Sequence, residues 1–134
     1  MITVYVDTSA LLKRVVLEPK SSALRVLLRK READGDLLTA SSLAWVEVWR
    51  ALRRAGVPEV VDVASLALSG IAEFPLDERV LVRARRVGLD ELRSLDAIHL
   101  AAAIAAGADA VLTYDARLAT SAEAVGLSVL APGA

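Results

Sequence analysis

The stretch MITVYVDTSALLKR (residues 1–14) begins with a strand-like segment that ends abruptly at an acidic residue. The segment is rich in β-branched residues and has no charged side chain before Asp7, so residues 2–6 are predicted to form a strand buried on both faces. Asp7 then lies at the carboxyl end of this strand. A carboxylate or hydroxyl there can cap the following helix, and capping by Asp7 or Ser9 is the commoner explanation for such residues taken alone.

The rest of the chain alternates between short apolar segments and longer segments with helical spacing. Further strands are predicted at 37–40, 71–76, 109–115 and 127–132. Helices are predicted at 9–17, 21–35, 41–56, 58–70 with Pro58 in the first turn, 77–89, 92–108 beginning near Ser94, and 116–127. Strands separated by helices indicate an α/β fold with a parallel sheet, in which ligands bind beyond the carboxyl ends of the strands.

Composition excludes several kinds of site. The 134 residues suit one domain, and the absence of cysteine removes disulfides, thiolate zinc sites and cysteine nucleophiles. A net charge of -1 means that nucleic-acid binding depends on local basic patches, and an apolar share of 55% favours a partner chain that covers some apolar surface. The longest uncharged run, residues 97–108, is too short to span a bilayer, so we expect a cytoplasmic protein.

Three further acidic residues are candidates for a shared site. Asp115 lies at the carboxyl end of the predicted fourth strand, so it approaches Asp7 if that strand neighbours the first. Glu47 lies on a predicted helix beside apolar neighbours, and Asp96 lies in the first turn of a helix whose later residues are almost all apolar. A buried acid requires a partner, which favours a functional role for these residues.

Each of these acids also has a purely structural explanation. Asp96 can complement the positive end of its helix, Asp115 can cap the helix after it, and Glu47 can pair with arginines further along its own helix. Taken singly, these are the commoner uses of acidic residues. Asp109 precedes a strand, at the opposite edge of the predicted sheet, and is interpreted as structural.

Four carboxylates in one cleft repel one another, and proteins tolerate such repulsion mainly where a divalent cation lies between them. Oxygen ligands favour hard ions such as Mg²⁺ or Mn²⁺ over Zn²⁺. An ion held in this way activates water and stabilises charge on a phosphate. If the four acids converge, they therefore predict hydrolysis of a phosphodiester bond.

Four segments together resemble the PIN-domain ribonucleases, specifically the VapC-type toxins of bacterial toxin–antitoxin pairs. They are YVDTSALLKR (5–14), SLAWVEVWRAL (42–52), LRSLDAIHLAAA (92–103) and VLTYDARLATSAEAVGL (111–127). Each segment alone is a weak signal, but their order and spacing in a chain of this length are specific. The resemblance implies a three-layer PIN-like fold, with a central parallel five-stranded sheet flanked by helices, in a single PIN domain over residues 1–134.

The resemblance also implies an activity and a site. The acidic Mg²⁺ site, with Mn²⁺ as an alternative ion, would consist of Asp7, Glu47, Asp96 and Asp115. Thr113 and Ser9 would be its polar supports. The activity would be cleavage of single-stranded RNA by an endoribonuclease, and a cognate VapB-type antitoxin would silence it. A homodimer that assembles further with this antitoxin is also implied.

Several other residues have more than one interpretation. His99, the single histidine, follows Asp96 by three residues and can share its helical face as a ligand or base. A histidine that packs in the core, or one that supports a site residue from behind, is commoner. Trp45 and Trp49 are interpreted as core residues with some interface exposure. Clustered basic residues are candidate phosphate contacts, although most are expected to be solvated: 29–31, 53–54, 79, 83, 85–86 and 93.

Two other classes of function compete with this interpretation. A phosphoacceptor domain similar to response-regulator receivers also places aspartates at strand ends, but it requires an acidic pair after the first strand and a lysine at the end of the last. Here Thr8 and Ser9 follow Asp7, and the last predicted strand contains no lysine. A catalytically silent binding module with the PIN fold would not require acids at all four positions. Metal-dependent cleavage of single-stranded RNA discriminates among these classes.

Overall fold

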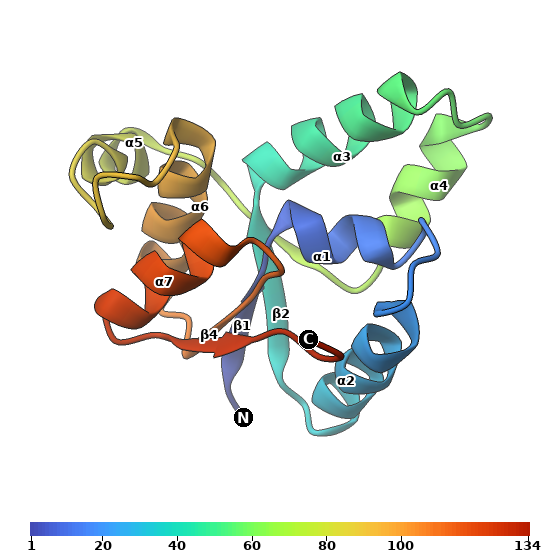
Figure 1. The fold of residues 1–134 in the computed structure, drawn as a ribbon, viewed down its shortest axis with the longest axis horizontal. Helices are drawn as coiled ribbons and strands as arrows, with labels where there is room; N and C mark the ends of the chain where they lie inside the picture. The colour runs from blue at the N-terminus through green and yellow to red at the C-terminus, as the bar shows by residue number, and fades with distance from the viewer.

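The computed structural model describes residues 1–134 as a five-stranded parallel sheet covered by helices (Figure 1). The strands are β1 (Thr3–Val6), β2 (Leu37–Ser41), β3 (Ala72–Phe74), β4 (Ala110–Leu112) and β5 (Ser128–Leu130). The helices are α1 (Thr8–Lys13), α2 (Ser21–Ala33), α3 (Ser42–Arg54), α4 (Val60–Ala67), α5 (Glu78–Ala84), α6 (Ser94–Ala105) and α7 (Ala116–Ala124). None of these helices combines the length and apolar character that crossing a membrane requires.

Alternation along the strands sends side chains into two separate cores, one on each face of the sheet. Val4 and Val6 of β1 pack with residues of α1 to α4, whereas Tyr5, between them, packs with residues of α5 to α7. All three side chains are fully buried. The predicted strand buried on both faces is therefore confirmed, and so is the three-layer α/β architecture.

The strand order β3-β2-β1-β4-β5 places β1 at the centre, with β4 as its neighbour. Val6 lies opposite Leu112, and the backbone N–H of Asp7 donates to the Leu112 carbonyl oxygen at 3.1 Å. Because all pairings in the sheet are parallel, the residues that follow β1 and β4 emerge at the same edge. This pairing brings Asp7 and Thr113 together.

One predicted helix start is wrong. Pro58 was expected in the first turn of the fourth helix, but α4 begins at Val60. Glu59 precedes the helix with a φ of 55°, in the left-handed region, and is the only residue other than glycine with a positive φ. The chain therefore makes a turn between Pro58 and the helix, and the helical spacing of the sequence does not reveal that turn.

Asp109 lies at the amino edge of the sheet, away from Asp7, as expected. Its carboxylate accepts a hydrogen bond from the Thr3 backbone N–H at 2.8 Å, which ties the β4 entry to the start of β1. We expect Asp109→Ala to lower the free energy of unfolding by about 1 kcal/mol, because one hydrogen bond is lost at an exposed position. Urea denaturation of the parent and the variant measures this difference, and equal unfolding free energies would contradict it.

Candidate active site

Asp7 is the most deeply enclosed of the four acids, with 3% of its surface exposed. Its Oδ1 accepts hydrogen bonds from the Ser9 hydroxyl at 2.6 Å and from the Ala10 backbone N–H at 3.2 Å, and its Oδ2 accepts one from the Thr113 hydroxyl at 2.7 Å. Burial raises the pKa of the Asp7 carboxyl above its ordinary value, although these hydrogen bonds lower it. Asp7 therefore caps α1, as the structural explanation predicts, and it is also a costly buried charge.

Ser9 and Thr113 link the turn after β1 to the turn after β4. The Thr113 oxygen, which donates to Asp7, also accepts from the Asp115 backbone N–H at 3.0 Å, and the Ser9 oxygen accepts from the Tyr114 backbone N–H at 3.0 Å. Both hydroxyls thus donate to Asp7, in the turn after β1, and both accept from a backbone N–H in the turn after β4. These links hold the two strand ends in register at the carboxyl edge of the sheet.

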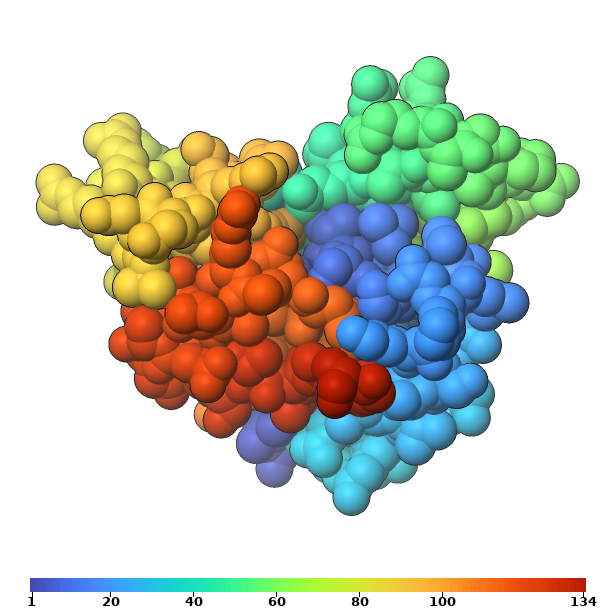
Figure 2. All heavy atoms as spheres, viewed as in Figure 1, coloured from blue at the N-terminus to red at the C-terminus, as the bar shows by residue number.

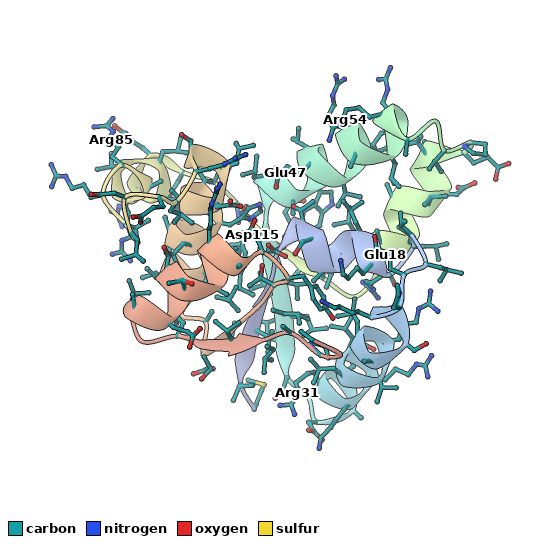
Figure 3. All side chains as sticks on the ribbon, in the orientation of Figure 1. Glu18, Arg31, Glu47, Arg54, Arg85 and Asp115 are labelled. Carbon is teal, nitrogen blue, oxygen red and sulfur yellow. The ribbon has the colours of Figure 1, made fainter.

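Asp115 lies in the turn between β4 and α7. Its Oδ1 accepts from the Leu118 backbone N–H at 2.9 Å and so caps α7. Figure 3 shows Asp115 at the start of α7 and Glu47 on α3, and Figure 2 shows the surface notched between α3 and the gold-to-orange segments of α6 and α7. The structural explanation for Asp115 is correct, but it does not account for the other acids nearby.

Asp96 lies in the first turn of α6 and its carboxylate accepts no hydrogen bond from the protein. Its pKa is raised, first by burial and then by the negative charge of Asp115, with smaller contributions from Asp7 and Glu47. His99 acts in the opposite direction. The four candidate acids therefore share one region of negative potential, although Asp7 follows β1, Glu47 is on α3, Asp96 is on α6 and Asp115 precedes α7.

Glu47 does not pair with the arginines of its own helix. Its Oε1 accepts hydrogen bonds from the Thr8 hydroxyl at 2.7 Å and from Nε2 of His99, while its Oε2 has no protein donor. Burial raises the pKa of Glu47, but the interactions with His99 and Thr8 outweigh burial and leave the pKa below its ordinary value. The surface-pairing explanation for Glu47 is therefore wrong.

His99 and Tyr5 form the buried side of this arrangement. His99 has 2% of its surface exposed, and its Nδ1 lies 2.7 Å from the Tyr5 hydroxyl oxygen, which also accepts from the Ser41 backbone N–H at 3.0 Å. Both ring nitrogens therefore have protein partners, which favours a packed or supporting histidine over a ligand or base. Tyr5 and Thr8 were not among the sequence candidates; a hydroxyl inside a strand expected to be wholly buried was the available signal for Tyr5.

Two arginines lie beside the acids. Arg93 and Arg117 line a shallow pocket together with Asp96, Asp115 and Ala116. Arg93 was one of the predicted phosphate contacts. Arg117 was missed because it is a single arginine at the start of a short helix and the sequence candidates were clustered basic residues. Arg54 and Arg85 lie on the outer parts of the molecule and point away from this pocket (Figure 3).

The two tryptophans agree with their mixed interpretation. Trp45 is partly buried and packs against the core formed with α1 to α4, while Trp49 is 37% exposed.

The four acids offer only carboxylate oxygens to a divalent cation. Carboxylate oxygens are the ligands that Mg²⁺ and Mn²⁺ prefer. The pKa of Asp96 is raised by burial and then by the charges of three other acids, which a cation would offset. As the side chains lie, no three acidic or histidine side chains form a metal-binding group, because Asp7 and Glu47 are turned toward protein donors. The acids therefore fit such an ion in ligand type and charge, and binding it requires their side chains to move.

The comparisons with known proteins identify the family. The model of the PIN domain family matches residues 4–124, and the chain therefore belongs to the PIN domain family. Within it, the chain is similar to the VapC ribonucleases: it is 41% identical to Ribonuclease VapC47 of Mycobacterium tuberculosis (strain CDC 1551 / Oshkosh), over 98% of each chain.

Solved structures agree with the fold. VapBC2 from Rickettsia felis, bound to a promoter DNA fragment, superposes with a TM-score of 0.75 at 14% identity, over 96% of this chain and 98% of that one. VapC20 from Mycobacterium tuberculosis, described as a toxin that cleaves the sarcin-ricin loop, gives a TM-score of 0.73 at 19% identity, over 96% and 99%. These likenesses confirm the PIN-like architecture.

Proposed function

We propose that the protein is a cytoplasmic, Mg²⁺-dependent endoribonuclease toxin of a VapBC-type pair. It hydrolyses phosphodiester bonds in single-stranded regions of RNA. The observation that carries this proposal is the gathering of Asp7, Glu47, Asp96 and Asp115 at the carboxyl edge of the sheet. Burial raises the pKa of Asp96 there, and the negative charges of Asp115, Asp7 and Glu47 raise it further. Further support comes from the similarity to a VapC ribonuclease over nearly the whole chain.

In this proposal the four acids hold the cation and other side chains position them. Thr113 and Ser9 fix the Asp7 carboxylate, and Thr8 fixes one oxygen of Glu47. Asp96 and the second oxygen of Glu47 have no protein donor, so they are free to become ligands. A bound divalent cation supplies Lewis-acid chemistry, because it lowers the pKa of water and stabilises charge on a phosphate.

The arginines of the pocket serve the substrate. Arg93 and Arg117 form no salt bridge within the chain, although they line the same pocket as Asp96 and Asp115. RNA carries a phosphate for every nucleotide, and an acidic site repels it unless cations lie nearby. We assign these two arginines to binding phosphates beside the scissile bond.

The proposed protein partner is a cognate VapB-type antitoxin, and the proposed toxin assembly is a homodimer that combines with it. Support comes from the fold likeness to VapBC2, which was solved as a pair on DNA, and to VapC20, which is described as a toxin. Exposed apolar side chains, among them Leu17, Leu66 and Trp49, offer surface for such contacts.

The test of the proposed function is cleavage of a mixed pool of unstructured RNA oligonucleotides by the purified protein. We expect cleavage with Mg²⁺ or Mn²⁺ and none in excess chelator, with activity restored when the cation is added back. Full activity in excess chelator would rule out the metal-dependent mechanism. Absence of cleavage with either cation would rule out the ribonuclease.

A pair of matched variants tests Asp115. Asp77 caps α5 by accepting from the Val80 backbone N–H at 3.0 Å, as Asp115 caps α7, but Asp77 lies outside the acidic site. Asparagine caps helices as well as aspartate does, so both Asp77→Asn and Asp115→Asn should keep the melting temperature of the parent. We expect Asp115→Asn alone to lose cleavage, by about ten-fold or more, which corresponds to roughly 1.4 kcal/mol of transition-state stabilisation. Equal rates in both variants would leave Asp115 as a cap only.

A further inference from the structure

We propose that His99 is a positioning residue for Glu47. Its Nε2–H, oriented through Nδ1 by the Tyr5 hydroxyl, holds Oε1 of Glu47 and leaves Oε2 free for the divalent cation. This inference rests on the proposed function, because it takes Glu47 as a ligand of the cation.

The geometry connects four elements through one buried imidazole. His99 is on α6, Glu47 is on α3 and Tyr5 is on β1, and both the His99 and the Tyr5 side chains are almost wholly buried. Thr8, on α1, adds a second hydrogen bond to the same Glu47 oxygen. The contact between His99 and Glu47 therefore joins α6, which packs on one face of the sheet, to α3, which packs on the other.

The partners of the Tyr5 hydroxyl define which nitrogen of His99 carries the proton in the neutral ring. The hydroxyl oxygen accepts from the Ser41 backbone N–H, so its own hydrogen is available to Nδ1 of His99. Nδ1 then accepts, and the hydrogen of the neutral imidazole resides on Nε2, which donates to Glu47. The hydrogen bonds then run in one direction, from the Ser41 N–H to the Tyr5 hydroxyl, from that hydroxyl to His99, and from His99 to Glu47, with a donor matched to an acceptor at each step.

A histidine that only fills the core does not require this arrangement. Burial with the Tyr5 bond alone would satisfy one nitrogen, yet the second nitrogen is directed to a carboxylate whose side chain is still 23% exposed. Groups that bond a metal-ligating carboxylate from behind fix its orientation, and their loss typically costs about 10- to 100-fold in metal affinity. His99 has the position of such a group.

The test uses two amide substitutions that differ in reach. In His99→Gln the side-chain amide extends to the depth of Nε2 and can still donate to Glu47, whereas in His99→Asn it reaches only the depth of Nδ1. The Mn²⁺ dissociation constant is measured from the electron paramagnetic resonance signal of free Mn²⁺, without RNA. We expect His99→Asn to weaken Mn²⁺ binding by about 10- to 100-fold and His99→Gln to remain within a few-fold of the parent.

Thermal unfolding in chelator separates positioning from packing. Both variants remove the same buried ring, so a residue that only packs would lower both melting temperatures and would not separate the two Mn²⁺ affinities. Equal Mn²⁺ affinity in parent and His99→Asn, or equal weakening in both variants, would overturn the inference and leave the proposed function intact. A parent that binds no Mn²⁺ at millimolar concentration would overturn both.

Tyr5→Phe provides a second route if the His99 variants do not fold. It keeps the ring and removes only the hydroxyl that orients Nδ1. We expect a several-fold weaker Mn²⁺ affinity in Tyr5→Phe, and an unchanged affinity would overturn the inference.

Discussion

We expect Asp96→Asn to abolish RNA cleavage, by about a thousand-fold or more, while the metal-free protein remains at least as stable as the parent. A thousand-fold loss corresponds to roughly 4 kcal/mol of transition-state stabilisation, the scale expected when a ligand charge of a catalytic cation is removed. Asparagine has nearly the same shape and keeps a side-chain oxygen, so the change removes charge and little else.

The expected stability follows from the direction of the pKa shift. The pKa of Asp96 is raised by burial and by Asp115, Asp7 and Glu47, so the folded state holds the charged form less favourably than the unfolded state does. Loss of the favourable interaction with the helix N-terminus, about 0.3–1 kcal/mol, acts in the opposite direction. The raised pKa indicates that burial and repulsion dominate, so removing the charge at neutral pH does not destabilise the metal-free fold.

The experiment compares cleavage rates and melting temperatures, in chelator and in Mg²⁺, for the parent, Asp96→Asn and the control Asp77→Asn. The control changes the same chemical group at a helix start whose acid is not among the charges that shift the pKa of Asp96. If Asp96→Asn were much less stable in chelator and gained as much from Mg²⁺ as the parent does, Asp96 would be a structural residue of α6 and not a ligand.

The second large effect is stabilisation by the divalent cation. A ligand that binds only the folded state stabilises it by about 2.7 kcal/mol when its concentration is a hundred times its dissociation constant. For a domain of this length, each kcal/mol raises the melting temperature by roughly 3–5 °C, so we expect a rise of about 10 °C in saturating Mg²⁺ or Mn²⁺. Asp96→Asn should show a much smaller rise.

The stability of the metal-free protein should also depend on pH in a defined direction. Asp7 and Asp96 both have raised pKa values, so their contribution to metal-free stability is greatest below the ordinary value of 3.8 and is lost as the pH rises through the raised values. As the pH falls from neutral through the raised pKa of Asp96, the unfolding free energy of the metal-free parent should therefore rise relative to that of Asp96→Asn. Glu47, whose pKa is lowered, loses its stabilising contribution only at still lower pH.

With the cation bound, the direction reverses. Binding requires ionised carboxylates, so protons compete with the cation and the stabilisation by Mg²⁺ should shrink as the pH falls. Melting curves of the parent and Asp96→Asn at several pH values, in chelator and in Mg²⁺, measure both trends. A Mg²⁺-induced rise that is the same at pH 7.5 and well below it, on the order of pH 5, would contradict this linkage.

Much of the fold was predictable from local sequence. Residues 2–6 are apolar and β-branched without a charge, and this pattern is sufficient for a central strand because such a segment is stable only when both faces are covered. The alternation of strands and helices then requires a parallel sheet. Because chain direction places the residue after each parallel strand at the same edge, the positions of Asp7 and Asp115 at that edge were predictable as well.

Only the tertiary structure decided which side chains meet. Glu47 and His99 are 52 residues apart and Tyr5 and His99 are 94 apart. The spacing of residues within one helix or strand therefore cannot predict these contacts. The pairing follows from the strand order, which places β4 beside β1, and from α3 and α6 reaching the carboxyl edge from opposite faces of the sheet. The local sequence determined where each acid lies along its own element. The packing of those elements around β1 determined that Asp7, which caps its own helix through a local contact, also shares a negative site with Asp96. The electrostatic interaction between the two acids depends on distance in space and not on separation along the chain.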